Sequence, residues 1–90
     1  MNINPAVTEL KKLTKEYNIS QVELSKRAFI PQNRISDLLY QKRRFTLESD
    51  LKLCKVFNLN PTYFLNLQQE FELKNAQNKY KNLLGKIIPL

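Results

Sequence analysis

The residues of this chain best suited to chemistry are amides and cations whose donors and acceptors match those of nucleic acid. Gln32 and Asn33 are adjacent, and the amide of each can form two hydrogen bonds with adenine. Arg34 follows directly and could either read guanine or hold a phosphate. The alternative is that these residues are ordinary polar groups on a solvated surface.

A second set of polar residues predicts contacts with a phosphate backbone. Lys42, Arg43 and Arg44 follow the amide-rich segment, where a backbone would pass if that segment entered a groove. Three consecutive cations could also be a solvated turn. Gln21 opens an earlier helical pattern, so its amide and the helix N-terminal N–H groups could hold a phosphate together.

Two short helices must position these groups. Ser20 and Glu23 form the S-x-x-E pattern of a capping box, which predicts a helix beginning directly after Ser20. Pro31 suits the first turn of a helix and disfavours helical geometry at Ile30, so a corner is expected over residues 29–31. Two helices joined in this way are typical of a helix-turn-helix motif, whose second helix enters the DNA major groove.

The apolar residues of both helices predict their buried faces. In the first helix we expect Lys26 and Arg27 outside and an inner side of Val22, Leu24 and Ala28. In the second helix the i, i+3, i+4 spacing predicts that the core contains Ile35, Leu38 and Leu39.

Three further helices complete an all-α prediction. Asn4-Pro5 predicts the start of the first helix and Asn18 its end, with an apolar side of Val7, Leu10, Leu13 and Tyr17. Thr46 predicts the cap of a fourth helix, with Glu48 and Asp50 near its positive end and Asn58 as its stop. Its expected inner stripe consists of Leu47, Leu51, Cys54 and Phe57.

The fifth predicted helix runs from Pro61 to Lys79 and carries a wide apolar stripe. One side holds Phe64, Leu67 and Phe71, and the stripe is widened by Tyr63, Leu65 and Leu73. Such width could cover the core or contact a second protein. Residues 1–79 then form one DNA-binding domain, and residues 80–90 form a tail that could dock, pair with another chain or fray. The candidate interface residues are Tyr63, Leu65, Phe71, Ile87 and Ile88.

The composition of the chain favours a binding protein over an enzyme. The 90 residues suffice for one small domain, and the net charge of +7 suits a polyanionic partner. Without histidine, and with one glycine and one cysteine, the chain offers no usual general base, metal site or phosphate-binding glycine loop. We therefore predict no enzyme activity, no metal and no cofactor. Cys54 is expected in the core, and the lone thiol and the absence of a membrane-spanning run favour the cytoplasm.

From Ile19 to Lys42 the sequence resembles the Xre/Cro (lambda repressor-like) helix-turn-helix family. The longer set of motifs, PQNRISDLL, KRRFT and NPTYFLNLQQEFEL, resembles the HigA antitoxins more specifically. Phe64 stands where that family usually has tryptophan, and the closing Ile88-Pro89-Leu90 is similar to its tail. The resemblance covers roughly residues 5–90.

The resemblance implies a five-helix domain that forms a homodimer, binds operator DNA and represses its own operon. It also implies a partner, a HigB-like toxin of the RelE-like mRNA interferase class, which the antitoxin neutralises by binding. It assigns base contacts to Gln32, Asn33 and Asp37. It assigns phosphate contacts to Gln21, Arg34, Lys42 and Arg43.

The chain departs from this family at three positions where glycine is usual, which here are Phe29, Gln41 and Arg44. If Phe29 must adopt positive φ, the corner is strained. Two alternatives therefore stay open beside the antitoxin. One is a stand-alone or phage-type Xre repressor without a toxin. The other is a protein-interaction module that neutralises a toxin without reading DNA.

Overall fold

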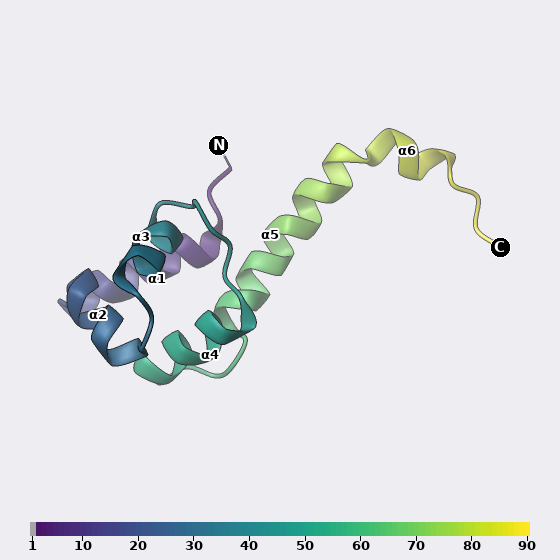
Figure 1. The fold of residues 1–90 in the computed structure, drawn as a ribbon. Coiled ribbons are helices and arrows are strands. Elements are labelled where there is room, and N and C mark those ends of the chain that lie inside the picture. The colour runs from purple at the N-terminus through teal and green to yellow at the C-terminus, as the bar shows by residue number, and fades with distance from the viewer. Residues whose placement is uncertain (1) are drawn as a thin grey trace.

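The computed structural model describes residues 2–90, and those residues fold into six helices without a strand (Figure 1). The helices are α1 (Pro5–Glu16), α2 (Gln21–Ala28), α3 (Gln32–Leu39), α4 (Leu47–Val56), α5 (Tyr63–Lys79) and α6 (Lys81–Lys86). The predicted all-α helix-turn-helix fold is confirmed. The short helix α6, inside the tail, is an element that the sequence pattern did not predict.

Within residues 2–90, local side-chain chemistry begins three of the helices and ends two of them as predicted. The side chain of Asn4 accepts from the Ala6 N–H at 2.9 Å, and that of Ser20 accepts from the Glu23 N–H at 3.1 Å. Thr46 and Ser49 form a reciprocal capping box at the start of α4. Asn18 and Asn58 adopt φ of 50° and 55° after α1 and α4, which confirms both predicted stops.

The core lies where the first four helices and the first half of α5 meet. α1 packs on α3 and α5, α2 packs on α3 and α4, and α4 packs on α5. The rings of Phe45 and Phe64 stack in its centre with 5.3 Å between centroids. Cys54 is buried there, as expected from its apolar neighbours.

Among residues 2–90, four residues that were predicted on apolar faces are exposed instead, namely Tyr17, Val22, Leu47 and Leu51. Val22 is exposed because it is two positions, about 200° of helix rotation, from Leu24, which faces the core. Leu47 and Leu51 are exposed because the buried stripe of α4 is centred on the line through Asp50, Leu53 and Phe57. The buried face of α4 is therefore rotated around the helix axis relative to the face that the spacing of Leu47 and Leu51 predicted.

Asp50 lies in the first turn of α4, as predicted, and it has a second role that the sequence did not indicate. It is fully buried, and its carboxylate accepts hydrogen bonds from the backbone N–H groups of Thr62 at 2.7 Å and of Phe64 and Leu65 at 3.0 Å. Asp50 of α4 thus caps the start of α5, where Thr62 has φ of 73° and provides no side-chain cap. For this reason α5 begins at Tyr63 and not at the predicted Pro61.

Gln68 is the second buried polar residue that organises the fold. Its amide accepts from the Phe45 N–H at 2.7 Å and from Asn4 Nδ2 at 3.1 Å, and it donates to the Phe45 carbonyl at 2.9 Å. The Gln41 side chain adds a bond from the Asn4 N–H. The segment between α3 and α4, residues 40–46, is thereby tied to α5 and to the start of α1.

The C-terminal part of the chain leaves the body as an extended arm (Figure 1). We use the name arm for residues 73–90, the second half of α5 with α6 and the segment after it. The structure measures 51 × 25 × 21 Å, and within residues 2–90 α6 packs only against α5. The arm exposes large apolar side chains, namely Leu73, Tyr80, Leu83, Leu84, Ile87, Ile88 and Leu90. Within residues 2–90 no helix has the length and apolarity needed to cross a bilayer.

Candidate nucleic-acid interface

α3 is anchored on one side and open on the other. Ile35 and Leu38 are fully buried, and Leu39 is nearly so, which confirms the predicted inner face. On the outer face Gln32 and Asn33 are exposed in the first turn. Neither amide makes a hydrogen bond to another part of residues 2–90, so both are available to an external partner. The two residues predicted to read bases therefore have the exposure that this role requires.

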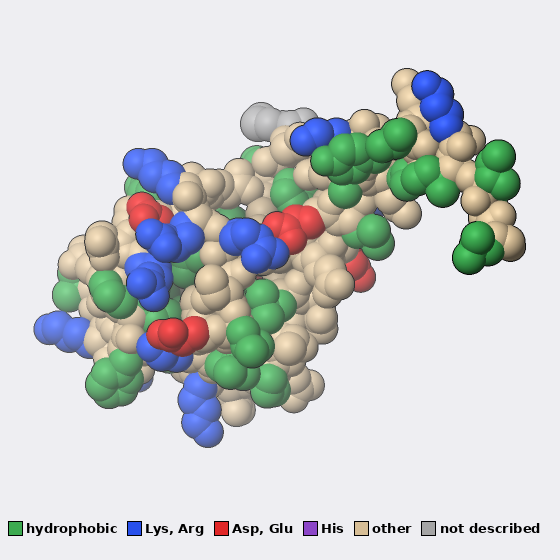
Figure 2. All heavy atoms as spheres, turned by 45° about the vertical axis from the view of Figure 1, so that its right-hand side comes forward, with side chains coloured by type: hydrophobic (Ala, Val, Ile, Leu, Met, Phe, Trp, Pro, Cys, Tyr) green, Lys and Arg blue, Asp and Glu red, His purple; other side chains and the backbone are tan. Residues whose placement is uncertain are grey.

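Arginines from two segments converge on one hollow beside α3. A hollow of about 400 Å³ is lined by Arg34 of α3, by Arg43 and Arg44 of the connector (residues 40–46), and by residues at the start of α4. On the face of the molecule that Figure 2 presents, cations and carboxylates lie side by side. Three of the cations predicted to contact phosphate are thus brought together by the fold. Lys42 is exposed next to them.

Two of these arginines have carboxylate partners within the chain. Arg43 lies 3.8 Å from the carboxylate of Asp37, the third candidate base reader. Arg44 donates two hydrogen bonds to the carboxylate of Glu72 in α5, from Nε at 2.9 Å and from Nη2 at 2.7 Å. The hydrogen bond from Arg44 is the main reason that the pKa of Glu72 lies below its ordinary value. Arg44 is therefore engaged with α5 in the free protein.

Gln21 lies apart from this hollow, on the other side of α3. It is half-buried at the start of α2 and lines a second hollow with Lys11 of α1 and Tyr40 at the end of α3. Sequence reasoning did not single out Tyr40, and it did not identify Lys11 because nothing in the spacing of α1 relates that residue to the motif. Their proximity results from the packing of α1 on α3.

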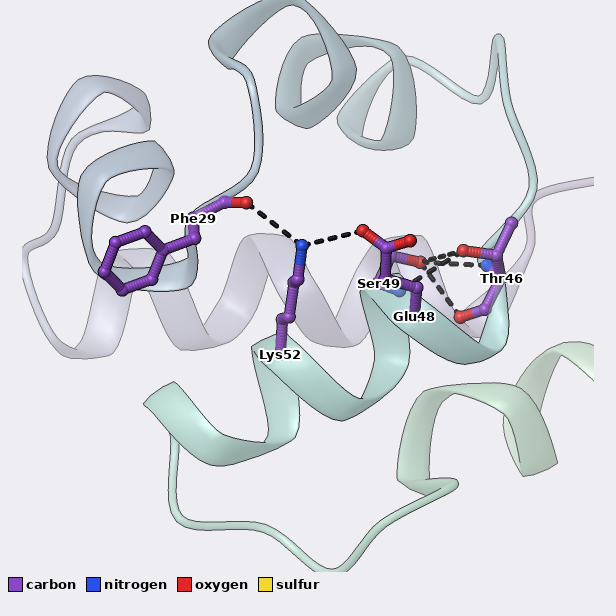
Figure 3. A network of polar contacts seen from close by, with 5 residues as sticks. All are labelled: Phe29, Thr46, Glu48, Ser49 and Lys52. Carbon is purple, nitrogen blue, oxygen red and sulfur yellow. Dashed lines mark hydrogen bonds and ion pairs between the residues drawn. The ribbon is translucent and has the colours of Figure 1, made fainter.

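The corner between α2 and α3 adopts the left-handed conformation without a glycine. Phe29 has φ of 55° and ψ of 42°, and the residue is 83% exposed. The Lys52 ammonium bonds the Phe29 carbonyl at 3.2 Å and the Glu48 carboxylate at 2.7 Å (Figure 3). Lys52 is the main cause of the lowered pKa of Glu48.

At the other two positions where the family usually has glycine, the backbone differs. Gln41 has positive φ, at 57°, whereas Arg44 does not.

We expect the Phe29→Gly variant to raise the free energy of unfolding by about 0.5–1 kcal/mol. Relief of the left-handed strain, about 1–2 kcal/mol, exceeds the extra unfolded-chain entropy of glycine, about 0.5–1 kcal/mol. Thermal denaturation measures the change. Phe29→Ala is the matched control, because it removes the ring but keeps the strain. Equal effects of the two substitutions would contradict this explanation.

The candidate interface residues fall into separate places. Tyr63 and Leu65 are half-buried and pack against the core, and Tyr63 makes an edge contact with Phe64 at 5.4 Å. Phe71 lies at the base of the arm in a groove that it forms with Pro5 and Leu73. Ile87 and Ile88 are exposed at the far end of the arm. The structure therefore does not unite these five residues in one patch.

Comparison with known proteins agrees with this geometry. Residues 9–70 match the family model of the Cro/C1-type HTH DNA-binding domain. An uncharacterized HTH-type transcriptional regulator of Haemophilus influenzae is 31% identical over 62 residues, which are 67% of this chain and 58% of that protein. The chain thus belongs to the Cro/C1-type helix-turn-helix family.

Solved structures narrow the family further. An addiction module antidote protein of the HigA family from Coxiella burnetii is 30% identical, with a TM-score of 0.83, over 99% of this chain and 98% of that one. Antitoxin HigA of Pseudomonas aeruginosa, solved with the higBA promoter, has the same fold. Its TM-score is 0.85 at 22% identity, over 100% of this chain and 99% of that one. Within the Cro/C1 class the chain belongs to the HigA antitoxins.

Proposed function

We propose that this protein represses its own operon by binding operator DNA and that it neutralises a HigB-like toxin of the RelE-like mRNA interferase class. The observation that carries the DNA-binding half is the exposed amide pair at the start of α3. Gln32 and Asn33 project from a helix whose other face is anchored by fully buried residues. The first turn of a recognition helix reaches deepest into the major groove.

Phosphate contacts would hold this helix in register. The hollow of Arg34, Arg43 and Arg44 flanks one side of α3, and Gln21 with Lys11 flanks the other. A duplex laid along α3 would pass one strand over each flank. Asp37 is proposed as a further base reader, which requires its carboxylate to leave Arg43 in the complex.

A homodimer is proposed through the arm. An isolated arm would leave seven large apolar side chains in water, and a second copy offers the same apolar surface in return. A symmetric pair would place two α3 helices about 34 Å apart, one turn of DNA. We propose that the pair acts in the cytoplasm, and that the toxin occupies a surface other than α3.

Fluorescence anisotropy with the gene's own upstream sequence tests the proposal. We expect tighter binding to that duplex than to a random duplex, and a log–log salt slope near −0.9 per phosphate neutralised. Equal affinity for both duplexes would instead favour the interaction module without DNA reading. Purification from the native cells should recover a small basic ribonuclease in stoichiometric amount, and its absence would favour the stand-alone repressor.

Asn33→Ala should weaken operator binding by about 1–3 kcal/mol, because it removes a two-bond base contact. The same substitution should leave binding to random DNA nearly unchanged. Lys42→Ala is the matched control: it should weaken both complexes equally and flatten the salt slope by about 0.9. An equal loss on both duplexes for Asn33→Ala would refute the base-reading role.

A further inference from the structure

The bond between Arg44 and Glu72 links the DNA-facing surface to a carboxylate outside the helix-turn-helix. Glu72 belongs to α5, and it meets Arg44 in a side-on arrangement of two bonds at 2.7 and 2.9 Å. The Nε–Nη2 edge that Glu72 occupies is also the edge that binds a phosphate side-on, through two parallel bonds. One guanidinium edge cannot serve both partners, so Glu72 and a phosphate must compete for it.

Arg44 is within reach of the proposed phosphate path. Arg44 lines the same hollow as Arg34 and Arg43, and Arg34 directly follows the amide pair of α3. Its backbone is fixed there, because Gln68 holds both backbone groups of the adjacent Phe45. Only the long side chain has to turn from α5 toward DNA. No rearrangement of the fold is needed.

The exposure of the pair makes this exchange energetically accessible. The side chains of Arg44 and Glu72 are 63% and 42% exposed, so water and salt weaken the bridge. A nearby phosphate can break a bridge of this kind. The free energy needed to break the bridge is then subtracted from the free energy of DNA binding, so the affinity for DNA is lower. We infer that Glu72 is an intramolecular competitor for Arg44 that restrains the affinity of the protein for the phosphate backbone.

This inference rests on the proposed DNA binding, and it predicts a gain of function. Glu72→Gln should tighten binding to operator and random duplexes alike, by about two- to fivefold, the range that a broken surface bridge allows. The salt slope should steepen by up to about 0.9, since Arg44 then neutralises a phosphate without first losing a carboxylate.

Glu70→Gln is the matched control. It removes the same charge from the same helix, and among residues 2–90 Glu70 forms no ion pair, so Arg44 is not released. A double-substitution cycle adds the second test. In an Arg44→Gln background, Glu72→Gln should produce no gain. Anisotropy titrations at several salt concentrations, with thermal denaturation of each variant, measure all of these effects.

The outcomes separate this inference from the proposed function. Unchanged or weaker binding by Glu72→Gln would overturn the inference and leave the pair as a brace for the connector. An equal gain from Glu70→Gln, or a gain that persists without Arg44, would also overturn it, since general charge would then explain the effect. Wild-type protein that binds random and operator duplexes equally would instead contradict operator recognition. The effect of Glu72 would still be measured on the random duplex.

Discussion

Asp50→Ala is expected to lower the free energy of unfolding by about 3–5 kcal/mol. The substitution leaves three backbone N–H groups at the start of α5 without their acceptor, and each buried unpaired group costs about 1–3 kcal/mol. Water can satisfy some of them, which is why the expected loss is below the full sum. Since small domains are stable by about 5–15 kcal/mol, a large part of the folded population would be lost.

Urea denaturation followed by circular dichroism measures this change. Asp50→Asn should cost less, because the amide keeps one oxygen as an acceptor for α5. Glu48→Ala, two residues earlier on α4, is the surface control and should cost far less, because Glu48 is exposed. Comparable losses for Asp50→Ala and Glu48→Ala would show that the cap contributes little.

Gln68→Leu is expected to lower the free energy of unfolding by about 2–4 kcal/mol. Leucine fills a similar volume, so the loss would come from the hydrogen bonds. The Phe45 N–H and carbonyl and the Asn4 amide would all lose their partner in a buried site. Because Gln68 also fixes the connector, DNA binding should weaken even at temperatures where the variant stays folded.

The neighbour Gln69 provides the control for this prediction. Gln69 is exposed on the same helix, and Gln69→Leu should change stability by no more than about 0.5 kcal/mol. Thermal denaturation and anisotropy titration of both variants separate the two effects of Gln68. Intact DNA affinity in a folded Gln68→Leu protein would show that the connector keeps its shape without the glutamine.

Local signals predicted much of the fold and part of the site. Asparagine and proline at helix ends, the Ser20 and Thr46 caps and the spacing of Ile35 and Leu38 are short-range chemistry, and the structure confirms each of them. The exposure of Gln32 and Asn33 follows from the same spacing, since residues opposite a buried stripe face solvent. The spacing of apolar residues predicted the wrong buried face where a helix carries apolar residues on two sides. Val22, Leu47 and Leu51 are examples, since each is exposed.

By itself the sequence therefore determined the first four helices and the outward face of α3, because these depend on contacts within about four residues, and its motifs indicated the family. Tertiary structure alone decided the roles of Asp50 and Gln68, which bond residues 12 to 64 positions away. It also decided that Arg44 meets Glu72, 28 positions along the chain, and that the tail stands clear of the body. A polar side chain reveals no distant partner in its spacing, because such a partner is chosen by the packing of whole helices.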